Sequence, residues 1–527
     1  MKASKILLLY PEVPQTFWSL THALEFFGKR TWSPPLGLLT VAAMLPQAFE
    51  RRLRDLNVAS LQEKDLAWAD YVFVSAMDVQ RESARRLIDR CRAAGKKVVA
   101  GGPLFTSDPG PFADVDHLVL NEAEVTLPPF LADLAQGTPK HFYSSPAFAD
   151  VTASPLPAYD LLDTSGYGAL SLQFSRGCPY QCEFCDVTAL FGRRPRAKSA
   201  SQIITELDNI YRAGWRGKIY FVDDNIMSNR PLFKNEVLPA IVRWKQGKRG
   251  ISFHTQITIN VADDQEMMDL LYAAGFDWVF IGIETPEEAS LAECNKKQNL
   301  HRDLPEQIRR LQRNGLQVQG GFIVGFDNDP PDIFERQYNL IQENGIVMAM
   351  VGLLQAPKGT ELYKRLEREG RLREGYVGNN VTDDTNVITR MDGEFLRRKY
   401  RILVKALYEP RNYYQRVKTF LAEYREPKEK PPFSREALLG VVRCFFWLGL
   451  VRKGRLDFWR VLLWTCFRKP ESIQNFLGLA ILGYHFRKIH EGLGRGPSRQ
   501  PPADRRPTEV QPSLPPEPVE TAEPVRN

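Results

Sequence analysis

Short apolar runs alternate with stretches of helical periodicity over the first 135 residues. Runs at 5–10, 54–58, 71–75, 97–100 and 117–120 have the length of buried strands. Helical segments lie between most of them, and one begins at Pro34-Pro35 and continues to Leu45. This α/β alternation predicts a Rossmann-like parallel sheet with helices on both faces, where ligands bind beyond the carboxyl ends of the strands.

The same alternation returns after residues 136–167, which contain Ser-Pro pairs and little periodicity and are predicted to be a linker. Strands are expected near 170–174, 218–222, 252–259, 278–283, 318–324 and 348–354. Six strand–helix units over residues 168–375 predict a partial parallel (β/α)6 barrel, with its chemistry at the C-terminal ends of the strands.

Beyond residue 375 the pattern changes again. Residues 376–490 are rich in Arg, Lys and aromatic residues with helical spacing, which predicts a basic helical C-terminal domain. The last stretch, 491–527, has 9 Pro in 37 residues and no aromatic residue, which predicts a disordered Pro-rich tail. The expected order is therefore N-terminal module (1–135), linker, barrel, helical domain and tail.

Composition supports a folded protein of several domains, because 43% of the 527 residues are apolar and 25% are charged. Seven cysteines are too few for a secreted disulfide scaffold. The sequence shows neither a signal-peptide core nor a run of 18 apolar residues. These features predict a cytoplasmic protein.

Charge is distributed unevenly along the chain. The formal net charge is +7, yet residues 397–490 alone hold 21 basic and 7 acidic residues, so the remainder is acidic. An anionic partner is expected, either a membrane or nucleic acid. The apolar run Ala437–Val451 and the tryptophans beside Arg452, Lys453 and Arg455 favour peripheral contact with a membrane over nucleic acid, while helices that simply cap the barrel are the alternative.

Three cysteines carry the strongest chemical signal. Cys178, Cys182 and Cys185 follow a predicted strand with the spacing C-x3-C-x2-C. Structural zinc sites usually use four protein ligands, no fourth ligand lies nearby in the sequence, and a disulfide would leave one cysteine over. Three thiolates suit a 4Fe-4S cluster that keeps one iron open to a substrate. The other four cysteines (91, 294, 444 and 466) are scattered and read as small buried hydrophobes.

This cysteine motif at the first strand of a partial barrel closely resembles the radical SAM superfamily. The resemblance implies that the open iron binds S-adenosylmethionine (SAM), which is then cleaved to a 5′-deoxyadenosyl radical. By position, Phe184 would contact the adenine, Asp223 and Asp224 the methionine amine, and Glu284 the ribose. Gly321 and Gly325 would let the adenine approach the backbone of the fifth strand.

The N-terminal module resembles the cobalamin-binding modules that precede some of these barrels. Gly37, Gly101 and Gly102 lie in loops that would face the corrin ring. The Asp-x-His-x-x-Gly motif that supplies a cobalt-ligating histidine is missing, and the stretch 55–60 contains Asn57 instead. A dinucleotide-binding fold is the rival, but no G-x-G-x-x-G follows the first strand.

The whole arrangement resembles the cobalamin-binding radical SAM family with a C-terminal domain of unknown function, whose best-understood members are hopanoid C-2 methylases. This implies a methyltransferase that acts on an unactivated carbon of a lipid-like substrate, with a flavodoxin- or ferredoxin-type electron donor. One alternative is a radical enzyme of cyclisation, rearrangement or oxidation without methyl transfer. Another is a cobalamin-binding sensor or carrier without catalysis.

Overall fold

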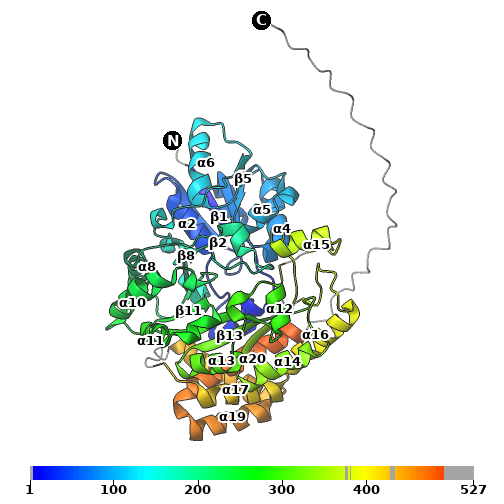
Figure 1. The fold of residues 1–527 in the computed structure, drawn as a ribbon. Coiled ribbons are helices and arrows are strands. Elements are labelled where there is room, and N and C mark those ends of the chain that lie inside the picture. Colours follow the sequence, from blue (N-terminus) through cyan, green and yellow to red (C-terminus); the bar gives the residue numbers. More distant parts are fainter. Residues whose placement is uncertain (1–3, 374, 376–377, 380–381, 428–433, 492–527) are drawn as a thin grey trace, which may run out of the picture. The chain divides into compact units, whose positions relative to one another are not determined.

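Two parallel sheets organise the computed structural model, which describes residues 4–373, 375, 378–379, 382–427 and 434–491 (Figure 1). The N-terminal sheet has the order β2-β1-β3-β4-β5-β6. Its strands are β1 (Lys5–Tyr10), β2 (Glu50–Asp55), β3 (Tyr71–Ser75), β4 (Lys97–Gly101), β5 (His117–Val119) and β6 (Phe142–Tyr143). Helices α2 (Leu36–Met44), α4 (Arg81–Ala93) and α6 (Ala123–Gln136) alternate with the strands.

Central strand β1 shows why an unbroken apolar run forms here. Ile6 and Leu8 belong to one hydrophobic cluster, while Leu7 and Leu9 belong to another on the opposite face. Successive residues of a strand point to opposite faces, so a sheet covered on both sides needs apolar residues at every position. The predicted Rossmann-like module is confirmed.

Two details differ from the sequence expectations. The second strand was expected at 54–58, but β2 covers Glu50–Asp55. It is an edge strand, and its exposed and half-buried residues alternate, so it lacks the apolar run of a central strand. The short strand β6 lies inside the segment expected to be a linker and extends the N-terminal sheet.

The second sheet is the predicted partial barrel. Its strands follow chain order: β7 (Ala169–Leu172), β10 (Lys218–Phe221), β11 (Ser252–Ile257), β12 (Phe276–Glu284), β13 (Gln317–Val324) and β14 (Met348–Leu353). Helices that include α8 (Ala200–Arg212), α13 (Leu304–Arg313) and α14 (Ile333–Glu343) separate successive strands. Ile203, Leu207 and Ile210 are buried at helical spacing, which is the apolar stripe that holds α8 against the sheet.

The segment between β1 and α2 contacts both end strands of this barrel. Trp18 Nε1 lies 3.0 Å from the sulfur of Met350 on β14. The amides of Gly168 and Ala169, at the start of β7, donate to the carbonyl of Trp32 over 3.1 and 2.7 Å. Residues of the N-terminal module therefore fill the open side of the barrel between β14 and β7.

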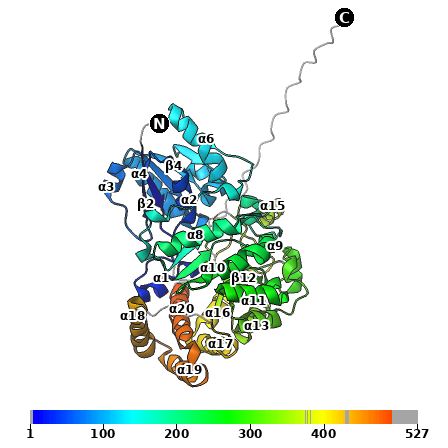
Figure 2. The ribbon, with the colours of Figure 1, turned by 90° about the vertical axis from the view of Figure 1, so that its left-hand side faces the viewer.

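Helices of the C-terminal region pack along the same side. They are α16 (Gly393–Tyr408), α17 (Pro410–Glu423), α18 (Arg435–Cys444), the π-helix η12 (Phe445–Val451), α19 (Arg455–Arg468) and α20 (Ile473–Glu491). The hydroxyls of Tyr400 and Tyr408 donate to β14 carbonyls, and the Phe486 ring stacks 4.2 Å from Phe17. Figure 2 shows α18 and α19 beside α20. The helical domain is confirmed, and the predicted tail lies outside the described residues except for Glu491.

A buried ionic network connects the two sheets. Glu122 and Glu124 follow β5, while Arg176 and Arg196 lie on the two-stranded ribbon of β8 (Ser175–Arg176) and β9 (Arg196–Ala197). Arg176 is 3.1 Å from Glu122 and 2.7 Å from Glu124, and Arg196 is 2.7 Å from Glu122. Burial acts to raise the pKa of Glu124, but the hydrogen bonds and charge of Arg176 outweigh it and lower this pKa to about 2. Glu124 is therefore ionised at neutral pH.

This network predicts a large stability effect from a small change. Glu122→Gln keeps an acceptor for the amide of Ala149 but leaves Arg196 and part of Arg176 without a buried countercharge. Removing one partner of a buried pair should lower the free energy of unfolding by about 3 kcal/mol, measured by urea denaturation. Glu50→Gln, an exposed carboxylate on β2, is the control and should leave the urea midpoint unchanged. Equal midpoints for both variants would show that the network does not stabilise the fold.

Candidate functional site

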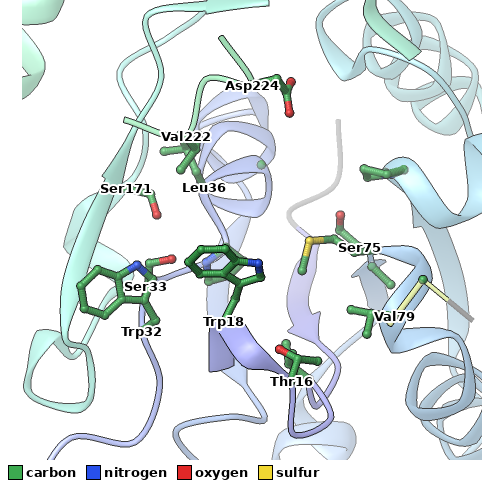
Figure 3. A pocket seen from close by; sticks show the side chains of 18 of the residues that line it. Thr16, Trp18, Trp32, Ser33, Leu36, Ser75, Val79, Ser171, Val222 and Asp224 are labelled. Carbon is green, nitrogen blue, oxygen red and sulfur yellow. The ribbon is translucent and has the colours of Figure 1, made fainter. Parts of the chain in front are cut away.

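A cavity of about 1210 Å³ lies where the carboxyl ends of both sheets meet (Figure 3). Ser75 and Gly101 line it from the N-terminal sheet, and Val222 and Asp224 from the barrel. Trp18 and Trp32 point into it from the segment between β1 and α2. A ligand placed here contacts both sheets at once.

The three predicted cluster cysteines lie in the loop that follows β8. Gly177 has a φ of +87°, and a Cβ there would come within 2.9 Å of the Arg194 carbonyl, so only glycine fits before Cys178. The Cys178 amide donates to the Gly192 carbonyl over 3.2 Å, and the Cys185 amide to the Cys182 carbonyl over 3.1 Å. The loop is thereby folded back on itself with all three thiols half-buried.

The surroundings of these thiols fit sulfur ligands. Amide donors approach two of them, Asn225 at 3.9 Å from the Cys178 sulfur and Gln298 at 3.5 Å from the Cys182 sulfur. Burial raises the pKa of Cys178 and Cys185 while no metal holds them. Among the described residues, no three His, Cys, Asp or Glu side chains converge closely enough for a single metal ion. A cubane cluster does not require such convergence, because each thiolate binds a different iron.

The two neighbouring aspartates have different surroundings. Asp223 is 1% exposed, and its carboxylate accepts hydrogen bonds from the amides of Phe174 and Ser175 and from the Ser175 hydroxyl. Asp224 faces the cavity, as Figure 3 shows. Desolvation by the surrounding protein, together with Asp186 and Asp223, raises the pKa of Asp224 to about 7. Asp223 thus holds the start of the cysteine loop, and Asp224 is the carboxylate available to a cation in the cavity.

Glu284 forms an ion pair that the sequence did not reveal. Its carboxylate is 2.6 Å from the ammonium of Lys296, which lies 5.8 Å from the ring of Phe184. Glu284 has a φ of +65°, a strained conformation for a residue with a side chain. A Cβ at Gly282 would come within 2.8 Å of the Lys296 nitrogen. Lys296 places a buried positive charge beside the cysteine loop, where it can meet a carboxylate.

The predicted glycines serve different purposes. A Cβ at Gly321 would meet the Phe280 ring at 2.7 Å, and Gly325, with a φ of +107°, turns the chain after β13 and lies outside the cavity lining. A Cβ at Gly101 or Gly102 would come within 2.5 Å of a neighbouring backbone or side-chain atom, so both positions require glycine. Gly37 has nothing within 4 Å of its missing Cβ, so it leaves open space toward the cavity. Of the three glycines expected to face a corrin ring, Gly37 is therefore the one whose missing side chain leaves open space.

Asn57 occupies the position where a cobalt-ligating histidine would be expected, and its side chain is hydrogen-bonded to the backbone. It accepts from the Val13 amide over 2.7 Å and donates to the Pro11 carbonyl over 3.1 Å. Among the described residues that line the cavity, the one histidine is His254 on β11. Its ring stacks on Tyr220 inside the barrel and meets the Trp32 ring edge-on at 6.3 Å.

The barrel part of the cavity has aromatic and apolar walls. Trp32 stacks on Trp278 at 6.0 Å, and Trp18 meets the Phe280 ring edge-on at 5.2 Å. Burial and Lys218 lower the pKa of His254 to about 3, so the imidazole is neutral. Sequence reasoning missed Trp18 and Trp32, although a connection of 25 residues between β1 and α2 is long enough to suggest a functional role.

Comparisons with known proteins agree with this geometry. The Radical SAM superfamily profile matches residues 172–341, the B12 binding domain 31–131, and a domain of unknown function, DUF4070, 360–497. The chain is 37% identical to "Uncharacterized methyltransferase sll1242" of Synechocystis over 92% of each chain. It is 32% identical to the hopanoid C-2 methylase of Rhodopseudomonas palustris over 93% of this chain and 94% of that one.

Solved structures share the fold at low sequence identity. The cobalamin-dependent S-adenosylmethionine radical enzyme OxsB, with aqua-cobalamin and SAM bound, is 16% identical with a TM-score of 0.60, covering 94% of this chain and 81% of that one. The radical SAM methyltransferase TsrM of Kitasatospora setae, with tryptophan and a SAM analogue, is 17% identical with a TM-score of 0.54, covering 71% and 78%. These likenesses show a common architecture.

The cysteine loop generates a direct test. Anaerobically reconstituted protein should bind about four irons per chain, and Ala at any of Cys178, Cys182 or Cys185 should abolish cleavage of SAM to 5′-deoxyadenosine. Cys294→Ala is the matched control, because this buried cysteine is nearby but its thiol contacts the Leu291 carbonyl. Iron content and 5′-deoxyadenosine are measured for all four. Cleavage at the wild-type rate by Cys182→Ala would show that the ligand assignment is wrong.

The cavity lining predicts that the cobalt of bound cobalamin has no histidine ligand from the protein. Protein labelled with ¹⁵N and loaded with unlabelled cobalamin should give the same cobalt(II) paramagnetic resonance spectrum as unlabelled protein, because Asn57 is occupied and His254 lies in the barrel. Gly37→Trp should lose the bound corrinoid by filling the open space, while Gly37→Ala should keep it. An isotope-dependent nitrogen splitting, or corrinoid retained by Gly37→Trp at wild-type level, would contradict this reading.

Proposed function

Because this chain belongs to the cobalamin-binding radical SAM family, with a 4Fe-4S cluster, SAM and cobalamin as its cofactors, we propose that it methylates an unactivated carbon of a lipid-like substrate. Full-length similarity to a hopanoid C-2 methylase supports a polycyclic, hopanoid-like lipid. The methyltransferase family is common to both curated relatives.

The side chains at the barrel end of the cavity support the proposed class of substrate. Trp18, Trp32, Trp278, Phe280 and Met350 form an aromatic and thioether part of this wall, beside polar side chains that include Gln256 and Gln319. Aromatic and thioether surfaces bind apolar rings through area burial and offer few hydrogen bonds to a polar substrate. A polar group of an amino acid or sugar held against these aromatic side chains would lose hydrogen bonds to water without replacement, at a cost of about 1–3 kcal/mol for each group. A lipid-like ring system suits this space better.

The residues of the site divide into three sets. We assign Cys178, Cys182 and Cys185 to the cluster. We assign Phe184, Asp224, Glu284 and Gly321, which line the cavity, to the place of SAM, while Lys296 supports Glu284 and Asp223 supports the cysteine loop. Gly325 turns the chain after β13 outside this lining. Gly37, Gly101 and Gly102 face the corrin ring.

Charge complementarity supports the SAM assignment. The methionine part of SAM carries an ammonium, and the Asp224 carboxylate faces the cavity to receive it. The Glu284 carboxylate also lines the cavity and is held by Lys296. When bound, the cofactors supply a hydrogen-abstracting radical and a transferable methyl group. The protein then has to orient the substrate carbon and keep out other hydrogen donors, and the Trp18 and Trp32 walls do both.

The same chemistry implies partners and a location. SAM cleavage consumes one electron, so a flavodoxin- or ferredoxin-type donor in the cytoplasm is expected. A hopanoid-like substrate is insoluble in water and would reach the enzyme from a membrane. The reaction would therefore take place at the cytoplasmic face of a bilayer.

Labelled SAM provides the test. Holoenzyme supplied with a hopanoid, an electron donor and SAM that carries a deuterated methyl group should yield a lipid heavier by one intact trideuteromethyl group, detected by mass spectrometry. Trp32→Ala should lower methyl transfer more than it lowers 5′-deoxyadenosine formation, because the indole lines the cavity and packs on Trp278 of the barrel. Tryptophan in place of the hopanoid is the substrate control and should remain unmethylated.

Different outcomes separate the alternatives. A modified lipid that contains no deuterium, formed together with 5′-deoxyadenosine, would replace methyl transfer by cyclisation, rearrangement or oxidation. SAM cleavage without any change in the hopanoid, combined with methylation of a polar compound, would overturn the lipid assignment.

A further inference from the structure

Apolar side chains gather on the outer side of α18, η12 and α19. Of the 17 large hydrophobic residues that are exposed in the described part of the chain, 11 lie between residues 438 and 467. We name them the C-terminal apolar surface: Leu438, Leu439, Val442, Phe446, Trp447, Leu450, Val451, Leu456, Trp459, Leu463 and Phe467. Soluble monomers rarely expose so many large apolar residues in one region, and such a region marks an interaction site.

Helical spacing shows that this exposure is a continuous face. Leu438, Val442, Phe446 and Leu450 follow one another at four-residue intervals, which places them along one side of α18 and η12. In α19, Leu456, Trp459, Leu463 and Phe467 repeat every three or four residues. A helix with only its inner face packed normally carries polar residues on the outer face. Here the outer faces are apolar as well.

The inner faces of the same helices are occupied. Cys444, Leu448, Phe458 and Val461 are buried within the main hydrophobic cluster of the barrel and helical domain. Gly440 lies so close to Phe27 that a Cβ would come within 2.5 Å of the ring. Packing against the barrel therefore explains the apolar residues on the inner faces of these helices. It does not explain the apolar residues on their outer faces. Trp464, beside the basic run, is half-buried against the core and is not part of the surface.

The surface has a basic rim. Residues 435–469 contain eight Arg or Lys and only two acidic residues, Glu436 and Asp457. Lys453, Arg455 and Arg468 are exposed. Arg452 has a structural role, because its guanidinium lies 5.1 Å from the Trp447 ring and 5.5 Å from the Tyr484 ring. An apolar face with basic residues around it matches the headgroups and upper acyl chains of an anionic bilayer.

No helix among the described residues is long and apolar enough to cross a membrane. We propose that the C-terminal apolar surface docks the enzyme in the plane of an anionic bilayer, with Leu456 and Phe467 inserted and Lys453, Arg455 and Arg468 at the headgroups. This surface is separate from the cavity, and the proposal holds whichever lipid is methylated.

Docking at this surface also bears on the cavity. The Arg443 guanidinium of α18 donates to the carbonyls of Glu25 and Phe26 over 3.0 and 2.9 Å. Those residues continue from the segment that carries Trp18 into the barrel opening. The helix at the membrane thus contacts the segment that forms part of the substrate wall, so a docked enzyme has this wall near its lipid source.

Vesicle flotation tests the charged part of the proposal. Holoenzyme should bind vesicles of phosphatidylglycerol and phosphatidylcholine more tightly than vesicles of phosphatidylcholine alone. The triple variant K453Q/R455Q/R468Q should bind the anionic vesicles about a hundredfold more weakly, because each basic residue near such a surface contributes about fivefold. The triple variant R86Q/K140Q/R212Q, at exposed basic positions elsewhere, is the control and should bind like the wild type. Added salt should weaken wild-type binding.

Apolar insertion has its own variant and control. L456S/F467S changes two residues that are 75% and 84% exposed, so folding and SAM cleavage without vesicles should be unaffected while vesicle binding falls. Ile402→Ser, at an exposed apolar residue on α16, should bind vesicles like the wild type. Trp fluorescence of the wild type should shift to the blue when vesicles are added, and L456S/F467S should show less of this shift.

Three results would overturn the proposal. These are equal binding of the wild type to anionic and neutral vesicles, equal losses in the test and control variants, or a holoenzyme dimer that L456S/F467S dissociates. The last would make the surface an interface between copies of this chain. Methyl transfer to a detergent-solubilised hopanoid is measured separately. A variant that keeps this transfer but loses vesicle binding supports the surface alone, and a wild type that binds vesicles but transfers no methyl group refutes only the proposed function.

Discussion

The placement of two guanidinium groups between two sheets is the constraint on which the site depends. Arg176 immediately precedes Gly177 and Cys178, and it is held by Glu122 and Glu124 from the N-terminal sheet. The cysteine loop therefore has its position fixed relative to the loops that face the opposite side of the cavity. Buried ion pairs contribute little net stability compared with apolar residues, but their geometry is specific. That specificity suits a site where two large cofactors have to meet one carbon atom.

The barrel is completed by parts of the chain that are distant in sequence. A sheet of six strands leaves an open side, and here the segment that bears Trp18 and Trp32 closes it, with α16 and α20 behind. The substrate wall thus consists of residues from the N-terminal module, the barrel and, indirectly, the C-terminal helices. None of the three regions can form the cavity alone. This interdependence explains why the relatives that match over the whole chain are the informative ones.

The sequence predicted those features that depend on local pattern. Strand β3 matched its apolar run because both of its faces are buried, whereas the edge strand β2 was misplaced. Cys178, Cys182 and Cys185 could be predicted as cluster ligands because one short loop supplies all three. Lys296 was missed, since Asn-Lys-Lys reads as a solvated turn and only the fold brings its ammonium beside Phe184. Asp223 and Asp224 could not be told apart by type, and their different roles follow from which side of the strand end each one faces.

The two ends of the cavity impose opposite demands, and the chain meets them with different residues. The end near the cysteine loop is charged, since Asp224 and Glu284 line the cavity there and Lys296 pairs with Glu284. The barrel end is lined in part by the indoles of Trp18 and Trp32, which point into the cavity (Figure 3). Since α18 donates to the carbonyls of Glu25 and Phe26, a displacement of that helix also changes the support of the Trp18 segment. The helical domain therefore supports the cavity wall from outside the lining. A large movement of α18 would displace the Trp18 segment and so change the barrel end of the cavity.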